Sequence, residues 1–195
     1  MTTSSTLHTA PEATVPPLVG EHWIETLNDG SHVLVRPIRP EDRERESEFI
    51  ERLSPESRHF RFLGEMRGAS PALLDQLVNV DNQKDMAFVA LVHDNSVLRE
   101  VGVSRYSTSG DDTHCECAVT VADDWQHRGL GVVLMRHLID VARRHGFRQM
   151  FSMDAASNEP MRDLANYLGF DRKRDPQDAT QVIHTLDLLK GNNNE

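Results

Sequence analysis

The chain has little of what would assign it to a specialised class of protein. Only two of its 195 residues are cysteine, so no disulfide framework is expected to hold the fold. No apolar run is long enough to cross a bilayer, and the N-terminus lacks the basic and apolar regions of a secretory signal. The sequence therefore predicts a cytoplasmic protein with no membrane partner.

Positive charge is also scarce, because 21 lysine and arginine residues face 31 aspartate and glutamate residues, a net charge of -10. A general nucleic-acid-binding protein needs a basic face to neutralise phosphates, so no nucleic-acid partner is expected. The acidic balance suits a cationic substrate such as an amine, although it also serves solubility alone. The ten histidines show no metal-ligand spacing, and we expect no metal site.

Composition divides the chain into three parts. Residues 1–19 are rich in Ser, Thr and Pro and are predicted to be a disordered tail. Residues 20–190 carry the apolar patterns of a single domain, and residues 191–195 form a polar C-terminal tail. Within the domain, segment 21–28 is predicted to be a short packed segment, and the remaining apolar patterns predict strands at 32–38, 86–93, 97–106, 115–122, 149–155 and 180–188, with another beginning at Phe170 before a charged loop at 172–178.

Helices are predicted from capping signals. Proline follows a polar or charged residue at Arg39-Pro40, Ser54-Pro55 and Ser70-Pro71, as at a helix N-terminus. The first of these helices has sparse apolar residues, which indicates a surface helix. A helix beginning near Ser157-Asn158 is predicted to end at Gly169.

The most informative stretch runs from Cys115 to His145. A Val- and Thr-rich strand is followed by Gln126-His127-Arg128-Gly129-Leu130-Gly131 and then by an amphipathic helix. Free N–H groups at a helix N-terminus favour an anion, and glycines let a phosphate approach the backbone. The loop is neither a Walker A loop nor a G-x-G-x-x-G dinucleotide fingerprint.

Within the strand, Glu116 lies between two cysteines. Alternation places it opposite Cys115, Cys117, Val119 and Val121, so those residues can pack inward while the carboxylate faces a cleft. The two thiols are expected to be reduced and half-buried, because residues two apart on a strand rarely satisfy disulfide geometry. A solvent-facing or salt-bridged Glu116 is the alternative interpretation.

The Q-x-x-G-x-G loop after a Val-rich strand resembles motif A of the GCN5-related N-acetyltransferases (GNAT). The segments VRPIRPEDRERESEFIERLSPESRHFRF and CECAVTV further resemble the acetyltransferase domain of bacterial protein lysine acetyltransferases. The resemblance implies an α/β (α+β) GNAT fold, with a mixed, mostly antiparallel central sheet flanked by helices on both faces. It also implies acetyl-CoA as co-substrate and a primary amine, a protein lysine or a small molecule, as acceptor.

The resemblance also assigns residues. Glu116 matches the family's catalytic glutamate, the base that would deprotonate a lysine amine whose pKa is ordinarily about 10.4. Acetyl-CoA is expected to contact the strand, the loop and the following Asn158 through a larger set of residues: Val119, Thr120, Val121, Gln126, His127, Arg128, Gly129, Leu130, Gly131, Val132 and Asn158.

One position departs from the family pattern. Many GNAT enzymes have a tyrosine general acid four residues before the Gly of the terminal Gly-Phe, and here that residue is Ala165. Tyr167 lies two residues further round the helix, and we interpret it as structural. This departure keeps open a non-catalytic acyl-CoA-binding sensor. The oligomeric state is also open, a homodimer included.

Overall fold

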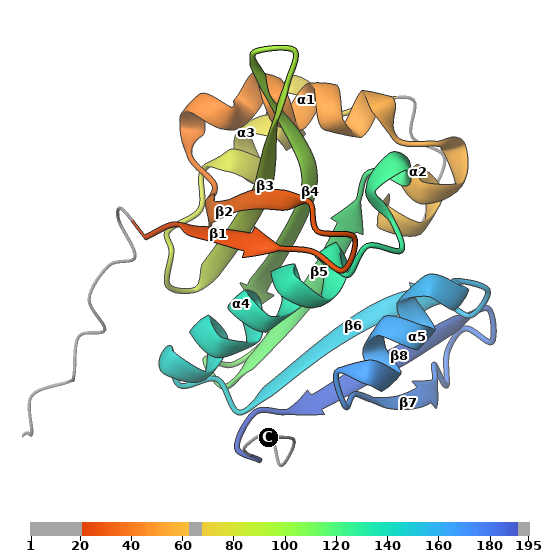
Figure 1. The fold of residues 1–195 in the computed structure, drawn as a ribbon. Helices are drawn as coiled ribbons and strands as arrows, with labels where there is room; N and C mark the ends of the chain where they lie inside the picture. The colour runs from red at the N-terminus through yellow and green to blue at the C-terminus, as the bar shows by residue number, and fades with distance from the viewer. Residues whose placement is uncertain (1–20, 63–67, 191–195) are drawn as a thin grey trace, which may run out of the picture.

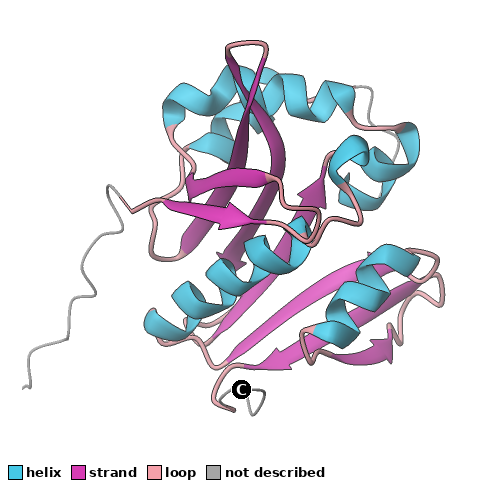
Figure 2. Cartoon of the chain, viewed as in Figure 1, coloured by secondary structure: helices cyan, strands magenta, loops and turns pink. Residues whose placement is uncertain are grey.

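The computed structural model describes residues 21–62 and 68–190, so both predicted tails lie outside the described residues. Figures 1 and 2 show the arrangement of the strands and helices. The strands are β1 (Trp23–Thr26), β2 (His32–Pro37), β3 (Asp85–Asp94), β4 (Val97–Thr108), β5 (His114–Val121), β6 (Gln149–Ala155), β7 (Asp171–Arg174) and β8 (Gln181–Asp187). The helices are α1 (Arg43–Arg52), α2 (Pro55–Phe62), α3 (Pro71–Val78), α4 (Leu130–Arg144) and α5 (Glu159–Tyr167), with short 3-10 helices at Pro40–Asp42 and Asp123–Trp125.

All of these strands belong to one sheet, in the order β1-β2-β3-β4-β5-β6-β8-β7. Each neighbouring pair is antiparallel except β5 and β6, which run parallel. This mixed, mostly antiparallel sheet confirms the fold class predicted from the sequence. No described helix is long and apolar enough to span a bilayer.

Helices cover opposite faces of the β3–β4–β5 region (Figure 1). Ser104 of β4 donates a hydrogen bond to the Leu134 carbonyl of α4, whereas the next residue, Arg105, contacts Glu46 of α1 and the Leu77 carbonyl of α3. Because successive strand residues point to opposite faces, α4 lies on one side and α1 and α3 on the other. Four fully buried side chains of α4 anchor its face of the core: Leu130, Leu134, Met135 and Leu138.

A bulge in β4 brings α4 close to the sheet. Ala90 pairs with Gly102, but Leu91 pairs with Glu100, which leaves Val101 as the extra residue. A Cβ at Gly102 would lie 2.9 Å from Leu134 Cδ1, so glycine permits this close packing.

Three sequence predictions were incomplete or need correction. Segment 21–28 contains strand β1, which pairs antiparallel with β2. The segment expected to be a charged loop at 172–178 begins as a strand, since β7 runs to Arg174 and pairs with β8. The helix α1 is not only a surface helix, because its own residue Glu46 is buried, with 2% of its surface exposed. In each case a tertiary partner supplied hydrogen bonds that the local pattern did not show.

The parallel strands β5 and β6 pair over only three residues, from His114–Gln149 to Glu116–Phe151. Beyond Glu116 the two strands separate, and Figure 1 shows the sheet opening into a wedge between them. The edge of β5 beyond this point is therefore not paired with β6.

Candidate active site

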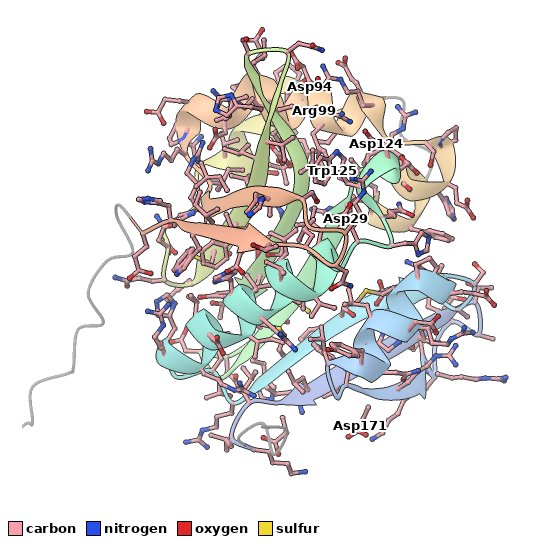
Figure 3. All side chains as sticks on the ribbon, viewed as in Figure 1. Asp29, Asp94, Arg99, Asp124, Trp125 and Asp171 are labelled. Carbon is pink, nitrogen blue, oxygen red and sulfur yellow. The ribbon has the colours of Figure 1, made fainter. Side chains whose placement is uncertain are left out.

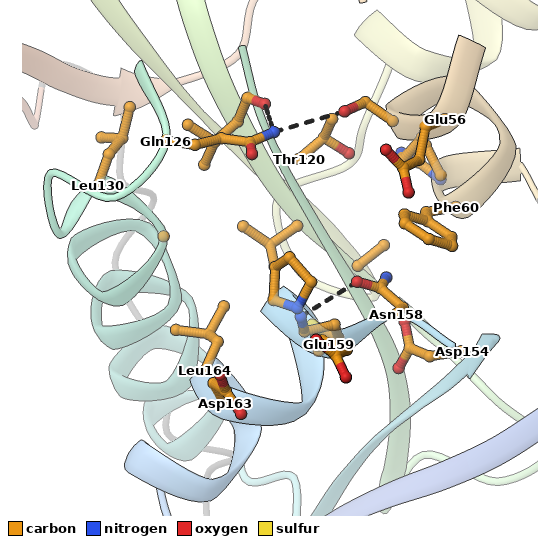
Figure 4. Close-up of a pocket in the computed structure, with 18 of the residues that line it drawn as sticks. Glu56, Phe60, Thr120, Gln126, Leu130, Asp154, Asn158, Glu159, Asp163 and Leu164 are labelled. Carbon is orange, nitrogen blue, oxygen red and sulfur yellow. Dashed lines mark hydrogen bonds between the residues drawn. The ribbon is translucent and has the colours of Figure 1, made fainter. Parts of the chain in front are cut away.

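A cleft of about 900 Å³ occupies the wedge between β5 and β6. Its lining comes from α2, the second half of β5, the loop before α4, the end of β6 and the start of α5 (Figure 4). It brings together most of the residues predicted from the sequence: Glu116, Val119, Thr120, Val121, Gln126, His127, Gly129, Leu130, Gly131, Val132 and Asn158.

Arg128 is the predicted residue that does not line the cleft. Its guanidinium lies 4.6 Å from the Trp125 ring centroid and 3.1 Å from Asp29 Oδ2, and it donates a hydrogen bond to the Asp124 carbonyl at 2.7 Å. Figure 3 labels these three partners. The Arg128 side chain therefore ties the loop to the β1–β2 turn instead of adding its charge to the cleft.

The loop before α4 has the backbone of an anion-binding turn. His127 has φ of 60°, and Gly129, the N-cap of α4, has φ of 89°. These left-handed residues turn the chain so that the first N–H groups of α4 face the cleft end, where the helix dipole adds positive potential. Gly129 also lies against Asn28, whose N–H donates to the Arg128 carbonyl at 3.0 Å.

The open edge of β5 presents backbone groups to the cleft. The N–H of Ala122 donates to the Val101 carbonyl of β4, and N–H directions alternate along a strand. The N–H groups of Val119 and Val121 therefore point away from β4, toward the cleft. The side-chain amide of Gln126 donates to the Val121 carbonyl at 3.3 Å on the same side. This edge can accept an extended, amide-containing ligand as an added strand.

Glu116 is exposed within an otherwise buried segment, because both neighbouring cysteines are buried. It shares the sheet face of Ala118 and Thr120, the face toward α2, as the alternation predicted. Arg61 of α2 lies close to it. Burial and the nearby Arg105 guanidinium lower the pKa of Arg61 to about 10, and the carboxylates of Glu46 and Glu116 oppose this shift.

Cys117 also lines the cleft, beside Glu116, and its thiol is a nucleophile that the cleft could use. Burial raises the pKa of the Cys117 thiol well above its usual range, and burial raises the pKa of Cys115 to about 12. Both thiols are free, as predicted, but they are fully buried where half-burial was expected. A thiol that stays protonated is a poor nucleophile, so burial argues against a nucleophilic role for either cysteine.

At the start of α5, Asn158 has two roles available. Its Oδ1 accepts a hydrogen bond from the Met161 N–H at 3.1 Å, which makes it the N-cap. Its amide nitrogen is left to donate to a ligand in the cleft. On the same helix Ala165 is fully buried, whereas Tyr167 is 64% exposed and contacts Arg136. Tyr167 does not line the cleft.

Individual residues of α2 were not among the site residues predicted from the sequence. Phe60, Arg61 and Phe62 line the cleft on the Glu116 side. The helix is fixed there by Asp123, which accepts hydrogen bonds from the Ser54 N–H and from the hydroxyls of Ser54 and Ser57 at 2.7–2.9 Å. Burial alone would raise the pKa of Asp123, but these hydrogen bonds together outweigh that effect, so the pKa of Asp123 lies below its usual value.

Met153 and Asp154 of β6 were also missed. Asp154 Oδ2 accepts a hydrogen bond from Ser152 Oγ at 2.6 Å and lies 3.0 Å from His184 Nδ1. The one signal in the sequence was an acidic residue at the end of an apolar strand, which does not by itself distinguish a cleft from the surface.

Comparison with known proteins agrees with this geometry. A family model described as "Acetyltransferase (GNAT) family" matches residues 43–170. Acetyltransferase PA5475 of Pseudomonas aeruginosa is 66% identical over 169 residues, which cover 87% of this chain and 91% of that protein. Acetyltransferase Pat of Mycolicibacterium smegmatis is 31% identical over 144 residues, 73% of this chain but only 42% of Pat. The crystal structure of the GNAT domain of S. lividans PAT superposes with a TM-score of 0.79 at 25% identity, covering 85% of this chain and 96% of that one.

The chain therefore belongs to the GNAT acetyltransferase family, and it is an acyltransferase enzyme. The resemblance deduced from the loop and the N-terminal block is confirmed at the level of the family. Its likeness to the GNAT domain of bacterial PAT proteins is confirmed in structure.

Proposed function

We propose that this protein transfers the acetyl group of acetyl-CoA to a primary amine, a lysine side chain, by direct attack, with Glu116 as general base. The observation that carries the proposal is the position of Glu116 at the point where β5 and β6 separate, with its carboxylate in the cleft and an unpaired strand edge beside it. The resemblance to bacterial protein lysine acetyltransferases supports lysine over other amines.

The cleft fits acetyl-CoA in size and chemistry. A volume of about 900 Å³ exceeds that of most small-ligand sites, as a co-substrate with a long pantetheine arm requires. The amides of Val119 and Val121 would hold the arm as an added strand, and the N-terminus of α4 would hold the pyrophosphate. Asn158 would donate to the arm from the opposite wall. The proposed reaction uses no metal ion.

In the proposed reaction Glu116 removes a proton from the lysine ammonium, directly or through water. The neutral amine then attacks the thioester carbonyl, a backbone amide of β5 stabilises the oxyanion, and the C–S bond breaks to release the thiolate of coenzyme A. The thiolate takes its proton from water or from the amine itself, since a thiol pKa of about 8.5 makes a strong acid unnecessary. This order of events accommodates Ala165 in place of the family's tyrosine.

Thiol release from acetyl-CoA tests the proposal. Against a panel of amines, Glu116→Gln should lower kcat by about 10²–10⁴-fold, with little change in acetyl-CoA affinity, because the base acts on the acceptor. Glu48→Gln, on the exposed face of α1, is the matched control and should leave turnover unchanged. Wild-type turnover by Glu116→Gln across a pH range would contradict the assignment of the base.

The sequence also left open a sensor that binds acyl-CoA without chemistry, but the matches to the acetyltransferase family make this chain an enzyme, and the sensor is not proposed.

A further inference from the structure

The part of the sheet formed by β6, β8 and β7 is covered on one face and bare on the other. Figure 1 shows α5 packed on one face, and none of the described helices lies opposite it. Burial agrees: Ser152 and His184 are buried on the covered face, whereas Phe151 and Ile183 are half-buried and Met153 is 37% exposed. We call Phe151, Met153 and Ile183 the β6–β8 face.

This apolar face is continuous with Glu116. Glu116 pairs with Phe151 in the parallel register, and Met153 pairs with Ile183 in the antiparallel one. Residues paired across strands project from the same face, so the carboxylate and the three apolar side chains share one surface. Met153 also lines the cleft, whereas Phe151 and Ile183 do not. A ligand that reaches Glu116 from this side therefore passes over the β6–β8 face.

The charges at the cleft indicate what kind of ligand this is. Among the described residues, its lining contains one arginine and one histidine, Arg61 and His127. The carboxylates are more numerous: Glu56, Glu116, Asp123, Asp154, Glu159 and Asp163. A ligand with a cationic amine and a neighbouring apolar group would complement the acidic cleft and the apolar β6–β8 face.

We propose that the β6–β8 face is the docking surface for a polypeptide acceptor, on which an apolar residue near the acetylated lysine packs against Met153 and Ile183. This inference rests on the proposed function and narrows its acceptor to a polypeptide. Met153 lies two residues from Phe151, about 7 Å along β6, and an extended peptide advances about 3.3 Å per residue. The apolar residue of the acceptor therefore lies two or three positions from the lysine.

The probes for this proposal are three acceptors: Nα-acetyl-lysine amide, and two eight-residue peptides with one lysine and either Leu or Ser at the second and third positions from it. In the wild type, kcat/KM for the Leu peptide should be about tenfold higher than for the Ser peptide, because one buried apolar side chain at an interface contributes on that scale. Ile183→Asp should remove this preference by raising KM for the Leu peptide, while turnover of the free lysine amide stays unchanged.

Ile24→Asp is the matched control, since Ile24 is a 66% exposed residue on β1 at the far edge of the sheet. The Ile24→Asp variant should change neither the preference for the Leu peptide nor the turnover of the free lysine amide. Ile183→Thr gives a milder second variant should the aspartate unfold the protein, and melting curves accompany both.

Equal reaction of the Leu and Ser peptides, or an equal loss for peptide and free lysine amide in Ile183→Asp, would overturn the docking surface while leaving the proposed function standing. A change from dimer to monomer in Ile183→Asp, seen by light scattering, would assign the face to a second copy of the chain instead. No thiol release with any amine would overturn the proposed function and this inference together.

Discussion

Two buried carboxyl groups near α1 have pKa values shifted in opposite directions. Burial would raise the pKa of Asp42, but the bidentate Arg36 guanidinium at 2.6–2.7 Å and the Arg39 N–H lower it. Burial raises the pKa of Glu100 well above its usual range, and the neighbouring Glu46 carboxylate raises it further. Neither Glu100 oxygen has a hydrogen-bond partner among the described residues, and Glu46 Oε2 has none either, so little compensates the burial of a charge on Glu100.

The Glu100 proton makes stability depend on pH. In the unfolded chain this glutamate ionises near the ordinary pKa of 4.5, whereas the folded side chain keeps its proton to higher pH. The free energy of unfolding therefore falls as the pH rises above about 4.5 toward the folded pKa. Glu100→Gln should stabilise the protein by about 1 kcal/mol at pH 8 and much less at pH 4.5. Urea unfolding at both pH values measures this, and an equal destabilisation at both would contradict it.

Single residues divide clearly into those that the sequence predicts and those that it does not. The direction of Glu116 followed from alternation along one strand, because both cysteines beside it are apolar enough to be buried. The burial of Glu46 did not follow, because it depends on Arg105, which is 59 residues away in the chain. Contacts of this kind have no local pattern.

At the scale of the element, the N-terminus of α4 depends on the β1–β2 turn. Gly129 has φ of +89°, and a Cβ there would lie 2.9 Å from Asn28 Nδ2. Gly129→Ala should therefore cost about 1–3 kcal/mol of stability and also weaken acetyl-CoA binding, because the turn and the loop must both move. Calorimetric titration with acetyl-CoA measures the affinity.

Gly146→Ala at the other end of α4 separates the two effects. Gly146 has φ of +85°, but a Cβ there would meet nothing within 4 Å. The Gly146→Ala variant should lose stability through backbone strain alone and keep its affinity for acetyl-CoA. Equal affinity in both variants would show that the Asn28 contact does not shape the loop.

Elements with a strong internal period were predicted well. The strand β6 has its predicted bounds of 149–155, and the helix α4 begins at Leu130, where the glycine loop was predicted to lead into an amphipathic helix, because apolar spacing marks both elements. The strand β1 was missed since it is four residues long and gains its order from β2 and from Trp23, whose ring lies 4.4 Å from that of His137 on α4. The strand β7 begins one residue after its predicted start, but its extension to Arg174 was missed, since all of its residues are charged and exposed.

For the whole molecule, the three-residue pairing of β5 and β6 predicts a large effect of ligand on stability. Acetyl-CoA bound in the wedge would join the two parts of the sheet, and a ligand that binds only the folded state adds about 2.7 kcal/mol at a hundred times its Kd. Melting temperature should rise with acetyl-CoA concentration, and amide exchange at Val119 and Val121 should slow. Protection of these amides already complete without ligand would contradict the open edge.

The cleft itself was only partly predictable. Its β5 and loop residues are continuous in sequence and carry a recognisable motif. Its α2 and β6 walls are joined to them by Asp123 and by strand register, and both arise only when the sheet assembles.

An open strand edge is also a surface that other chains can join. The backbone groups of β5 beyond Glu116 are available to any extended segment, and proteins usually protect such edges with charge, bulges or a covering element. Here the co-substrate would serve as that cover. Handling the enzyme without it should therefore favour intermolecular strand pairing and precipitation, and coenzyme A in the purification buffer should suppress both.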